Sequence, residues 1–164
     1  MHYYLGLEVW TRPEEVFLGQ GKYVINMLKR FDMVGCKLMT SPMIKNLKRL
    51  RSSESIPVDP SKYIKLIGSL MYLVNTWPNI RFAVKVLNQF QVEPRHDYWI
   101  ATKHILRYLQ GTIHYCLKYH RRNDVHLIGY KDSDWGGNEQ NGRSTTEGCF
   151  SLGSSMISVM IRNK

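Results

Sequence analysis

Two aspartates, Asp132 and Asp134, are separated by one residue in the stretch GYKDSDWGGN, which covers residues 129–138. They follow an apolar run, HLIGY, and carboxylate oxygens are the ligands that Mg²⁺ prefers in proteins. A two-metal site that cleaves phosphodiesters needs several carboxylates, and this stretch supplies only these two. We expect the two side chains to point to opposite faces of a strand, so that at most one faces a metal. The spacing alone therefore favours a strand that ends in a polar turn over a metal site.

Basic side chains form a second set of candidate functional residues, because Lys and Arg bind phosphate groups. Lys103 and Arg107 are four residues apart in a stretch with helical spacing, so we expect them on one face. Four more lie in the run KNLKRLR, which covers 45–51: Lys45, Lys48, Arg49 and Arg51. Both groups are candidates for binding a nucleic-acid backbone. The alternative for each is an ordinary basic surface that only contacts solvent.

The net charge of the chain also indicates a negatively charged partner. The 164 residues carry a formal charge of +10, and residues 1–120 contain 17 Lys and Arg against 8 Asp and Glu. Residues 121–164 contain 6 against 5, so the basic surplus belongs to the first three-quarters of the chain. Such a surplus fits phosphate backbones or other anionic surfaces. A hydrophobic content of 43% is enough for a core and is not that of a disordered chain.

The spacing of the remaining residues argues against other kinds of site. The three cysteines form no CxxC pair and the six histidines form no HxxxH or HExxH pair, so neither a zinc site nor a disulfide framework is indicated. The cysteines are expected to be reduced thiols of an intracellular protein, whose compartment and oligomeric state stay open. No stretch approaches the roughly 18–20 apolar residues of a membrane span, and the N-terminus does not resemble a secretory signal, so no membrane partner is expected.

The order of the elements that must position these residues is typical of an α+β fold. Asp59 and Pro60 predict a helix start, with a capping side chain and a proline in the first turn. Gly68 lies inside that helix, where we expect close helix packing to explain it, and Gly35 is expected to cap the first helix. A long connection at 36–58 has little periodicity. Apolar spacing predicts strands at 2–9, 16–20, 115–120, 125–134, 145–153 and 155–161, and helices at 21–33, 61–76, 79–91 and 96–110.

Nine segments, taken in order along the chain, carry a family resemblance. They are HYYLGLEV (2–9), FLGQGKYV (17–24), LKRFDMVGCK (28–37), TSPM (40–43), YIKLIGSLMYL (63–73), WPNIRFAVKVLNQF (77–90), HILRYLQGTIHYCLKY (104–119), GYKDSDWGG (129–137) and RSTTEGCFSLG (143–153). Their order and spacing strongly resemble the polymerase polyprotein of copia-type LTR retrotransposons. The resemblance covers nearly the whole chain.

The resemblance implies three pieces, at 1–35, 36–120 and 121–164. The piece at 1–35 resembles the end of the reverse transcriptase palm, with the hairpin that holds the primer terminus. The piece at 36–120 resembles the helical thumb and connection, which lies on the template–primer duplex, in agreement with the basic surplus there. The piece at 121–164 resembles the start of a ribonuclease H domain, an incomplete three-stranded antiparallel sheet. Asp132 takes the place of its first catalytic, Mg²⁺-binding aspartate, and Asp134 is the less favoured neighbour.

The resemblance also implies that parts of both active sites are absent from these 164 residues. The Y-x-D-D motif of the polymerase does not occur, and further ribonuclease H carboxylates would lie beyond Lys164. We therefore expect a catalytically inactive relict that binds no Mg²⁺ of its own. It would retain at most non-specific binding to an RNA–DNA hybrid or template–primer duplex. Two alternatives stay open: a ribonuclease H-type nuclease completed by another chain or a longer parent, and a host-recruited interaction module.

Overall fold

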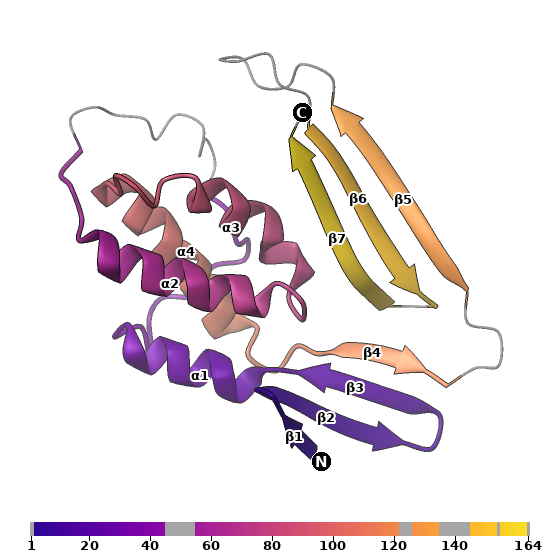
Figure 1. The fold of residues 1–164 in the computed structure, drawn as a ribbon. Helices are drawn as coiled ribbons and strands as arrows, with labels where there is room; N and C mark the ends of the chain where they lie inside the picture. Colours follow the sequence, from indigo (N-terminus) through magenta and orange to yellow (C-terminus); the bar gives the residue numbers. More distant parts are fainter. Residues whose placement is uncertain (1, 45–54, 122–125, 135–144, 154, 164) are drawn as a thin grey trace. The chain divides into compact units, whose positions relative to one another are not determined.

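The computed structural model of the chain describes residues 2–44, 55–121, 126–134, 145–153 and 155–163 (Figure 1). Within the last three strands, only the backbone is described at 132–134, 145–147 and 158–163. The chain divides into two compact units. Residues 1–19 and 116–164 make a sheet unit, and residues 20–115 make a helical unit.

The first sheet of the sheet unit is antiparallel, in the order β1-β2-β3-β4. Its strands are β1 His2–Tyr4, β2 Leu7–Arg12, β3 Glu15–Gly19 and β4 Leu117–His120. The single strand predicted at 2–9 was wrong, because Leu5 and Gly6 have φ angles of 47° and 77° and turn the chain back on itself. Positive φ at both positions of a two-residue loop suits the twist of a hairpin. At the other edge, β4 pairs with β3, and Leu117 lies opposite Leu18.

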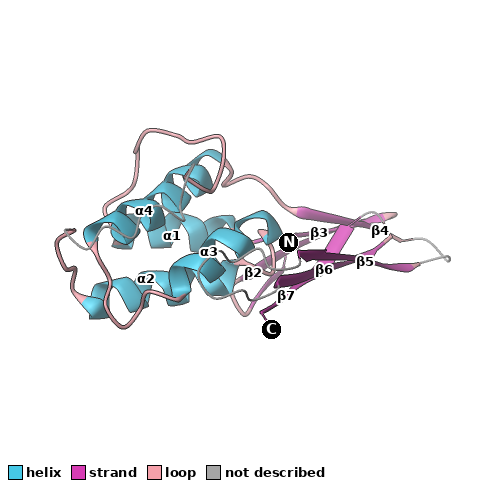
Figure 2. Ribbon diagram, turned by 90° about the horizontal axis from the view of Figure 1, so that it is seen from above, coloured by secondary structure: helices cyan, strands magenta, loops and turns pink. Residues whose placement is uncertain are grey.

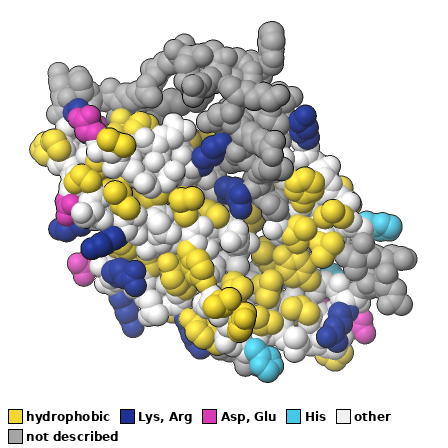
Figure 3. Space-filling view, in the orientation of Figure 1, with side chains coloured by type: hydrophobic (Ala, Val, Ile, Leu, Met, Phe, Trp, Pro, Cys, Tyr) yellow, Lys and Arg dark blue, Asp and Glu magenta, His cyan; other side chains and the backbone are white. Residues whose placement is uncertain are grey.

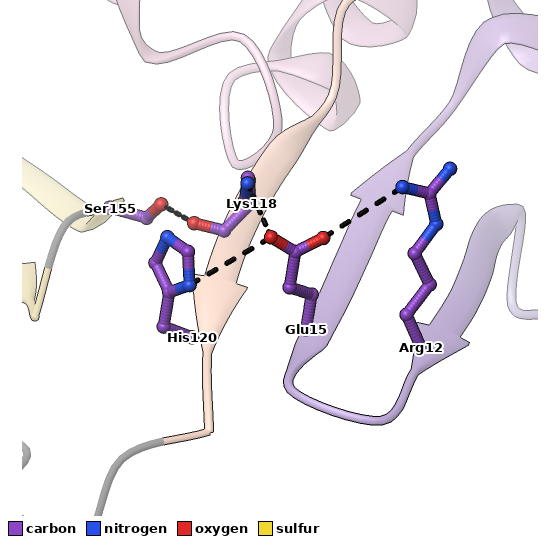
Figure 4. A network of polar contacts seen from close by, with 5 residues as sticks. All are labelled: Arg12, Glu15, Lys118, His120 and Ser155. Atoms are coloured by element: carbon purple, nitrogen blue, oxygen red, sulfur yellow. Dashed lines mark hydrogen bonds and ion pairs between the residues drawn. The ribbon is translucent and has the colours of Figure 1, made fainter.

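A carboxylate at the start of β3 ties β4 to the hairpin (Figure 4). Glu15 Oε1 lies 2.5 Å from Lys118 Nζ and 3.9 Å from His120 Nδ1. The other oxygen, Glu15 Oε2, lies 4.0 Å from Arg12 Nη1. The hydrogen bond from Lys118 is the main reason that the pKa of Glu15 is lowered. The Ser155 hydroxyl donates to the Lys118 carbonyl oxygen, so β4 is also bonded to the start of the last strand.

A second antiparallel sheet follows, with strands in the order β5-β6-β7. They are β5 Leu127–Asp134, β6 Thr145–Leu152 and β7 Ser155–Asn163, within two residues of the predicted bounds. The Tyr119 hydroxyl donates to the Met156 carbonyl oxygen at 3.1 Å, which joins β4 to β7. An antiparallel three-stranded sheet thus lies at the predicted place, while its likeness to ribonuclease H stays a prediction.

The described part of the helical unit packs four α-helices around one core, and Figure 2 shows them grouped together. They are α1 Gly21–Arg30, α2 Pro60–Leu73, α3 Arg81–Asn88 and α4 His96–Gly111, with a 3₁₀ turn, η2 Pro78–Ile80, before α3. Helix α2 begins as predicted, because the Asp59 carboxylate accepts a hydrogen bond from the Ser61 N–H at 2.9 Å and Pro60 fills the first turn. The core is made of apolar side chains that recur on each helix, among them Val24, Leu28, Leu66, Leu70, Leu87, Ile105 and Leu109.

Hydrogen bonds inside this core fix its largest side chains. Trp77 is 2% exposed, and its indole Nε1–H donates to Thr112 Oγ1 at 3.3 Å. The buried hydroxyl of Tyr63 donates to the Leu87 carbonyl oxygen at 2.8 Å. Burial raises the pKa of Tyr63 to about 12. Each bond satisfies a polar group whose burial without a partner would be unfavourable.

Helix α1 ends three residues earlier than predicted. The Met33 N–H donates to the Leu28 carbonyl oxygen at 2.8 Å, and the Asp32 N–H donates to the Lys29 carbonyl oxygen at 3.3 Å. These two bonds form a Schellman motif, in which Asp32 takes the left-handed position with a φ of 53°. Glycine is commoner at such a position. The prediction of Gly35 as the capping residue was wrong, because Asp32 takes that position instead.

The two units divide the chain differently from the predicted ranges 1–35, 36–120 and 121–164. Helix α1 belongs to the helical unit rather than to a piece with the hairpin, and β4 belongs to the sheet unit. Strands β3 and β4 are neighbours in the first sheet, although residues 20–115, which form the helical unit, lie between them in the sequence. The helical unit is therefore an insertion between two neighbouring strands.

Gly68 is not explained by close packing, because a Cβ atom added there meets nothing within 4 Å apart from its chain neighbours and the backbone of its own helix. Replacing Gly68 by alanine is therefore expected to raise the free energy of unfolding by about 0.5–1 kcal/mol, since alanine loses less backbone entropy in a helix. Urea denaturation followed by far-UV circular dichroism measures this change.

Gly35→Ala is the matched control, because a Cβ atom added there also meets nothing within 4 Å, but the backbone φ is 73°. A left-handed backbone disfavours alanine, so this variant is expected to lose about 1–2 kcal/mol. A loss of stability in Gly68→Ala as large as that in Gly35→Ala would show that position 68 is packed after all.

Candidate nucleic-acid interface

The whole net charge of the chain lies in the helical unit. Residues 20–115 contain 15 Lys and Arg against 5 Asp and Glu, whereas the sheet unit contains 8 against 8. Helices α1, α2 and α3 contain no carboxylate at all. On the face shown in Figure 3, Lys and Arg side chains lie among hydrophobic ones. The positive charge is thus concentrated on one compact unit, which makes that unit the candidate for contact with a polyanion.

Helix α4 carries Lys103 and Arg107 on one face, as their spacing predicted. Its buried side contains Tyr98, Ala101, Thr102, Ile105, Leu106, Tyr108 and Leu109, as the apolar period indicates. Lys103 and Arg107 lie on the other side, half-buried and one helical turn apart. The Nε atom of Arg107 is buried without a hydrogen-bond partner among the described residues. The two cations therefore form a short row along one helix.

Trp99 adds an aromatic side chain to this row that the sequence pattern did not predict. The Nζ atom of Lys103 lies 5.3 Å from the centre of the Trp99 ring, within the range of a cation–π contact. Trp99 is half-buried and packs against the core of the helical unit. The spacing of four residues between Trp99 and Lys103 is the signal that could have found this contact.

His104 lies beside the basic row and anchors the preceding connection to α4. Its Nε2 atom lies 3.0 Å from the Ser41 carbonyl oxygen, which can only accept, so the imidazole N–H donates there. Burial lowers the pKa of His104, and the positive charge of Arg107 lowers it further. A neutral imidazole next to the cations is therefore the favoured form near neutral pH.

The four basic residues of the run at 45–51, Lys45, Lys48, Arg49 and Arg51, lie outside the described residues. The described chain on either side of them is attached to α4. Before them, Ser41 bonds His104 and Ile44 packs against the core. After them, the Ser55 hydroxyl accepts a hydrogen bond from the Asp97 N–H at 3.2 Å, and the Ile56 carbonyl oxygen accepts one from the His96 N–H at 2.8 Å.

Asp132 and Asp134 belong to a continuous strand. The backbone of β5 pairs with β6 so that Asp132 lies opposite Glu147 and Asp134 opposite Thr145. The expectation of opposite faces was wrong, because positions two residues apart in an unbroken strand share one face. Their side chains lie outside what the structure describes. Among the residues that it does describe, no three His, Cys, Asp or Glu side chains gather to hold a metal ion.

A basic helical unit with two cations one turn apart on one helix is a candidate surface for contact with a polyanion. None of the helices in the described ranges combines the length and the hydrophobicity needed to cross a membrane. No protein-family model matches the chain, and no solved structure matches it either.

Proteins with a similar sequence indicate the family of this chain. An uncharacterized mitochondrial protein of Arabidopsis thaliana is 37% identical over 158 residues, which are 96% of this chain and 65% of that protein. The retrovirus-related Pol polyprotein from transposon RE2 of the same plant is 36% identical over 96% of this chain. The one from transposon TNT 1-94 of Nicotiana tabacum is 34% identical over 88%. The chain covers 11% of the length of each polyprotein.

This chain belongs to the family of retrovirus-related Pol polyproteins of transposons. It corresponds to one short part of such a polyprotein.

Proposed function

We propose that these residues are part of a copia-type Pol polyprotein and bind the sugar–phosphate backbone of an RNA–DNA hybrid or template–primer duplex. The observation that carries the proposal is the placement of the entire net charge of +10 on the helical unit. The copia-type assignment is supported by the order of the nine sequence segments, from HYYLGLEV to RSTTEGCFSLG.

The contacts expected from this surface are electrostatic and independent of sequence. Lys103 and Arg107 lie one turn apart on α4, and two described residues on either side of the basic run at 45–51, Ser41 and Ser55, are hydrogen-bonded to the same helix. Lys and Arg that neutralise phosphates release counterions, which supplies most of the free energy of non-specific binding. Contacts of this kind position a protein on nucleic acid without reading bases.

The sheet unit is proposed to contain the start of a ribonuclease H domain, with β5–β7 as its first strands. Asp132 would be the first Mg²⁺-binding aspartate of that domain, and Asp134 its less favoured neighbour. Mg²⁺ needs several oxygen ligands, and phosphodiester cleavage with two metal ions needs carboxylates from more than one element. These 164 residues on their own are therefore proposed to bind nucleic acid without cleaving it.

A binding and cleavage assay on the purified chain tests the proposal. A fluorescently labelled RNA–DNA hybrid is expected to bind at low salt, with an affinity that falls steeply as salt is raised. The hybrid is expected to stay intact with Mg²⁺ or Mn²⁺.

Each alternative has its own result in this assay. Cleavage by the wild-type chain that is lost in Asp132→Asn would replace the inactive assignment with a ribonuclease H-type nuclease. Undetectable binding at low salt would reject the nucleic-acid role and leave an interaction module.

A further inference from the structure

We infer that Trp99 is a positioning residue, which holds the Lys103 ammonium group in place for contact with a phosphate. The inference rests on the proposed function and assigns a role to a side chain that does not itself carry charge. Its basis is the geometry of α4, where the indole lies one turn before the cation.

The contact between the two side chains restricts the lysine. Lys103 Nζ lies 5.3 Å from the centre of the Trp99 ring, whose face attracts a cation. A lysine side chain has four rotatable carbon bonds, and an exposed one loses much of that freedom when its ammonium group binds a phosphate. The indole is itself held by packing against the core, so it offers a fixed surface. Part of the ordering of Lys103 is therefore complete before nucleic acid binds.

The position of this pair within α4 links it to the rest of the basic row. Trp99, Lys103 and Arg107 follow one another at intervals of four residues, about 6 Å along the helix axis. The Nε atom of Arg107, the next cation along the row, is buried and has no hydrogen-bond partner among the described residues. The contact with Trp99 therefore gives one of the two cations of this row a fixed direction along the helix.

A purely structural role for Trp99 makes a different prediction. Leucine at position 99 preserves apolar packing but removes the ring face, and phenylalanine preserves a weaker ring face. If Trp99 only fills space, the substitution would act equally whether or not a lysine stands at position 103. A double-mutant cycle separates the two roles, because only a positioning role depends on Lys103.

The experiment measures binding of the full chain to a labelled RNA–DNA hybrid over a range of salt concentrations. Trp99→Leu is expected to weaken binding about two- to fivefold, and Trp99→Phe is expected to weaken it less. The slope of log affinity against log salt should stay unchanged in Trp99→Leu, since Lys103 still reaches its phosphate. Lys103→Gln should make that slope shallower by about 0.9. Adding Trp99→Leu to Lys103→Gln should weaken the affinity no further.

The outcomes distinguish this inference from the proposed function. Wild-type affinity in Trp99→Leu, with weakened binding in Lys103→Gln, overturns the positioning role alone. A Trp99→Leu effect that persists in full without Lys103 also overturns it, because the effect would then be structural. Unchanged binding in Lys103→Gln overturns both the inference and the proposed contact at α4.

Discussion

Replacing Trp77 by alanine is expected to lower the free energy of unfolding by about 3–5 kcal/mol. The side chain is 2% exposed and lies in the core of the helical unit, between the end of α2 and η2. Its removal leaves a cavity and takes away a hydrogen bond to Thr112. Urea denaturation followed by the helical signal in circular dichroism measures the change.

Two further variants separate packing from hydrogen bonding at this position. Trp77→Phe keeps most of the buried ring and loses only the N–H, so it should lose less than Trp77→Ala. Thr112→Val removes the acceptor and leaves the buried indole N–H without a partner, at an expected cost of about 1–3 kcal/mol. A loss below about 1 kcal/mol in Trp77→Ala would mean that the tryptophan is not part of the core.

Replacing both Lys103 and Arg107 by glutamine is expected to weaken binding of an RNA–DNA hybrid by roughly ten- to a hundredfold at low salt. Each substitution removes one cation from the row on α4 and leaves a shorter, neutral polar side chain in its place. The loss should be similar for hybrids of different sequence, because backbone contacts carry no sequence information. Fluorescence anisotropy at fixed salt measures the affinity.

Arg121→Gln with Lys131→Gln is the matched control, since it lowers the net charge of the chain by the same amount. Both residues are exposed and belong to the sheet unit, in which basic and acidic residues balance. This variant is expected to bind the hybrid nearly as well as the wild-type chain. Equal losses in the two variants would mean that total charge, rather than the helical unit, sets the affinity.

Helices α2 and α4 follow from local signals in the sequence. Asp59 and Pro60 mark the start of α2, and the apolar period along α4 identifies its buried side. The hairpin turn at Leu5 and Gly6 was missed, because it interrupts a run whose composition is that of one strand. Asp32 was missed as a helix end, since a non-glycine residue in a left-handed conformation has no clear sequence signal.

Long-range pairing is the part of the fold that the sequence left open. The segment around β4 has the composition of a strand, but nothing local indicates that its partner is β3, at the other end of the helical unit. The sequence alone places the basic surplus in residues 1–120, and the pairing of β3 with β4 narrows its location to residues 20–115. In the same way, spacing predicted that Lys103 and Arg107 share a face. The same spacing makes Trp99 a neighbour of Lys103, but the contact between ammonium and ring also depends on side-chain rotamers.

The salt dependence of hybrid binding shows whether the cations of the helical unit contact the nucleic-acid backbone. Log affinity is measured against log salt for the wild-type chain and for the two double variants, Lys103→Gln with Arg107→Gln and Arg121→Gln with Lys131→Gln. We expect the slope to be shallower by about 1.8 in the α4 variant and unchanged in the sheet-unit variant. Identical slopes for all three proteins, or no binding by the wild-type chain at low salt, would contradict it.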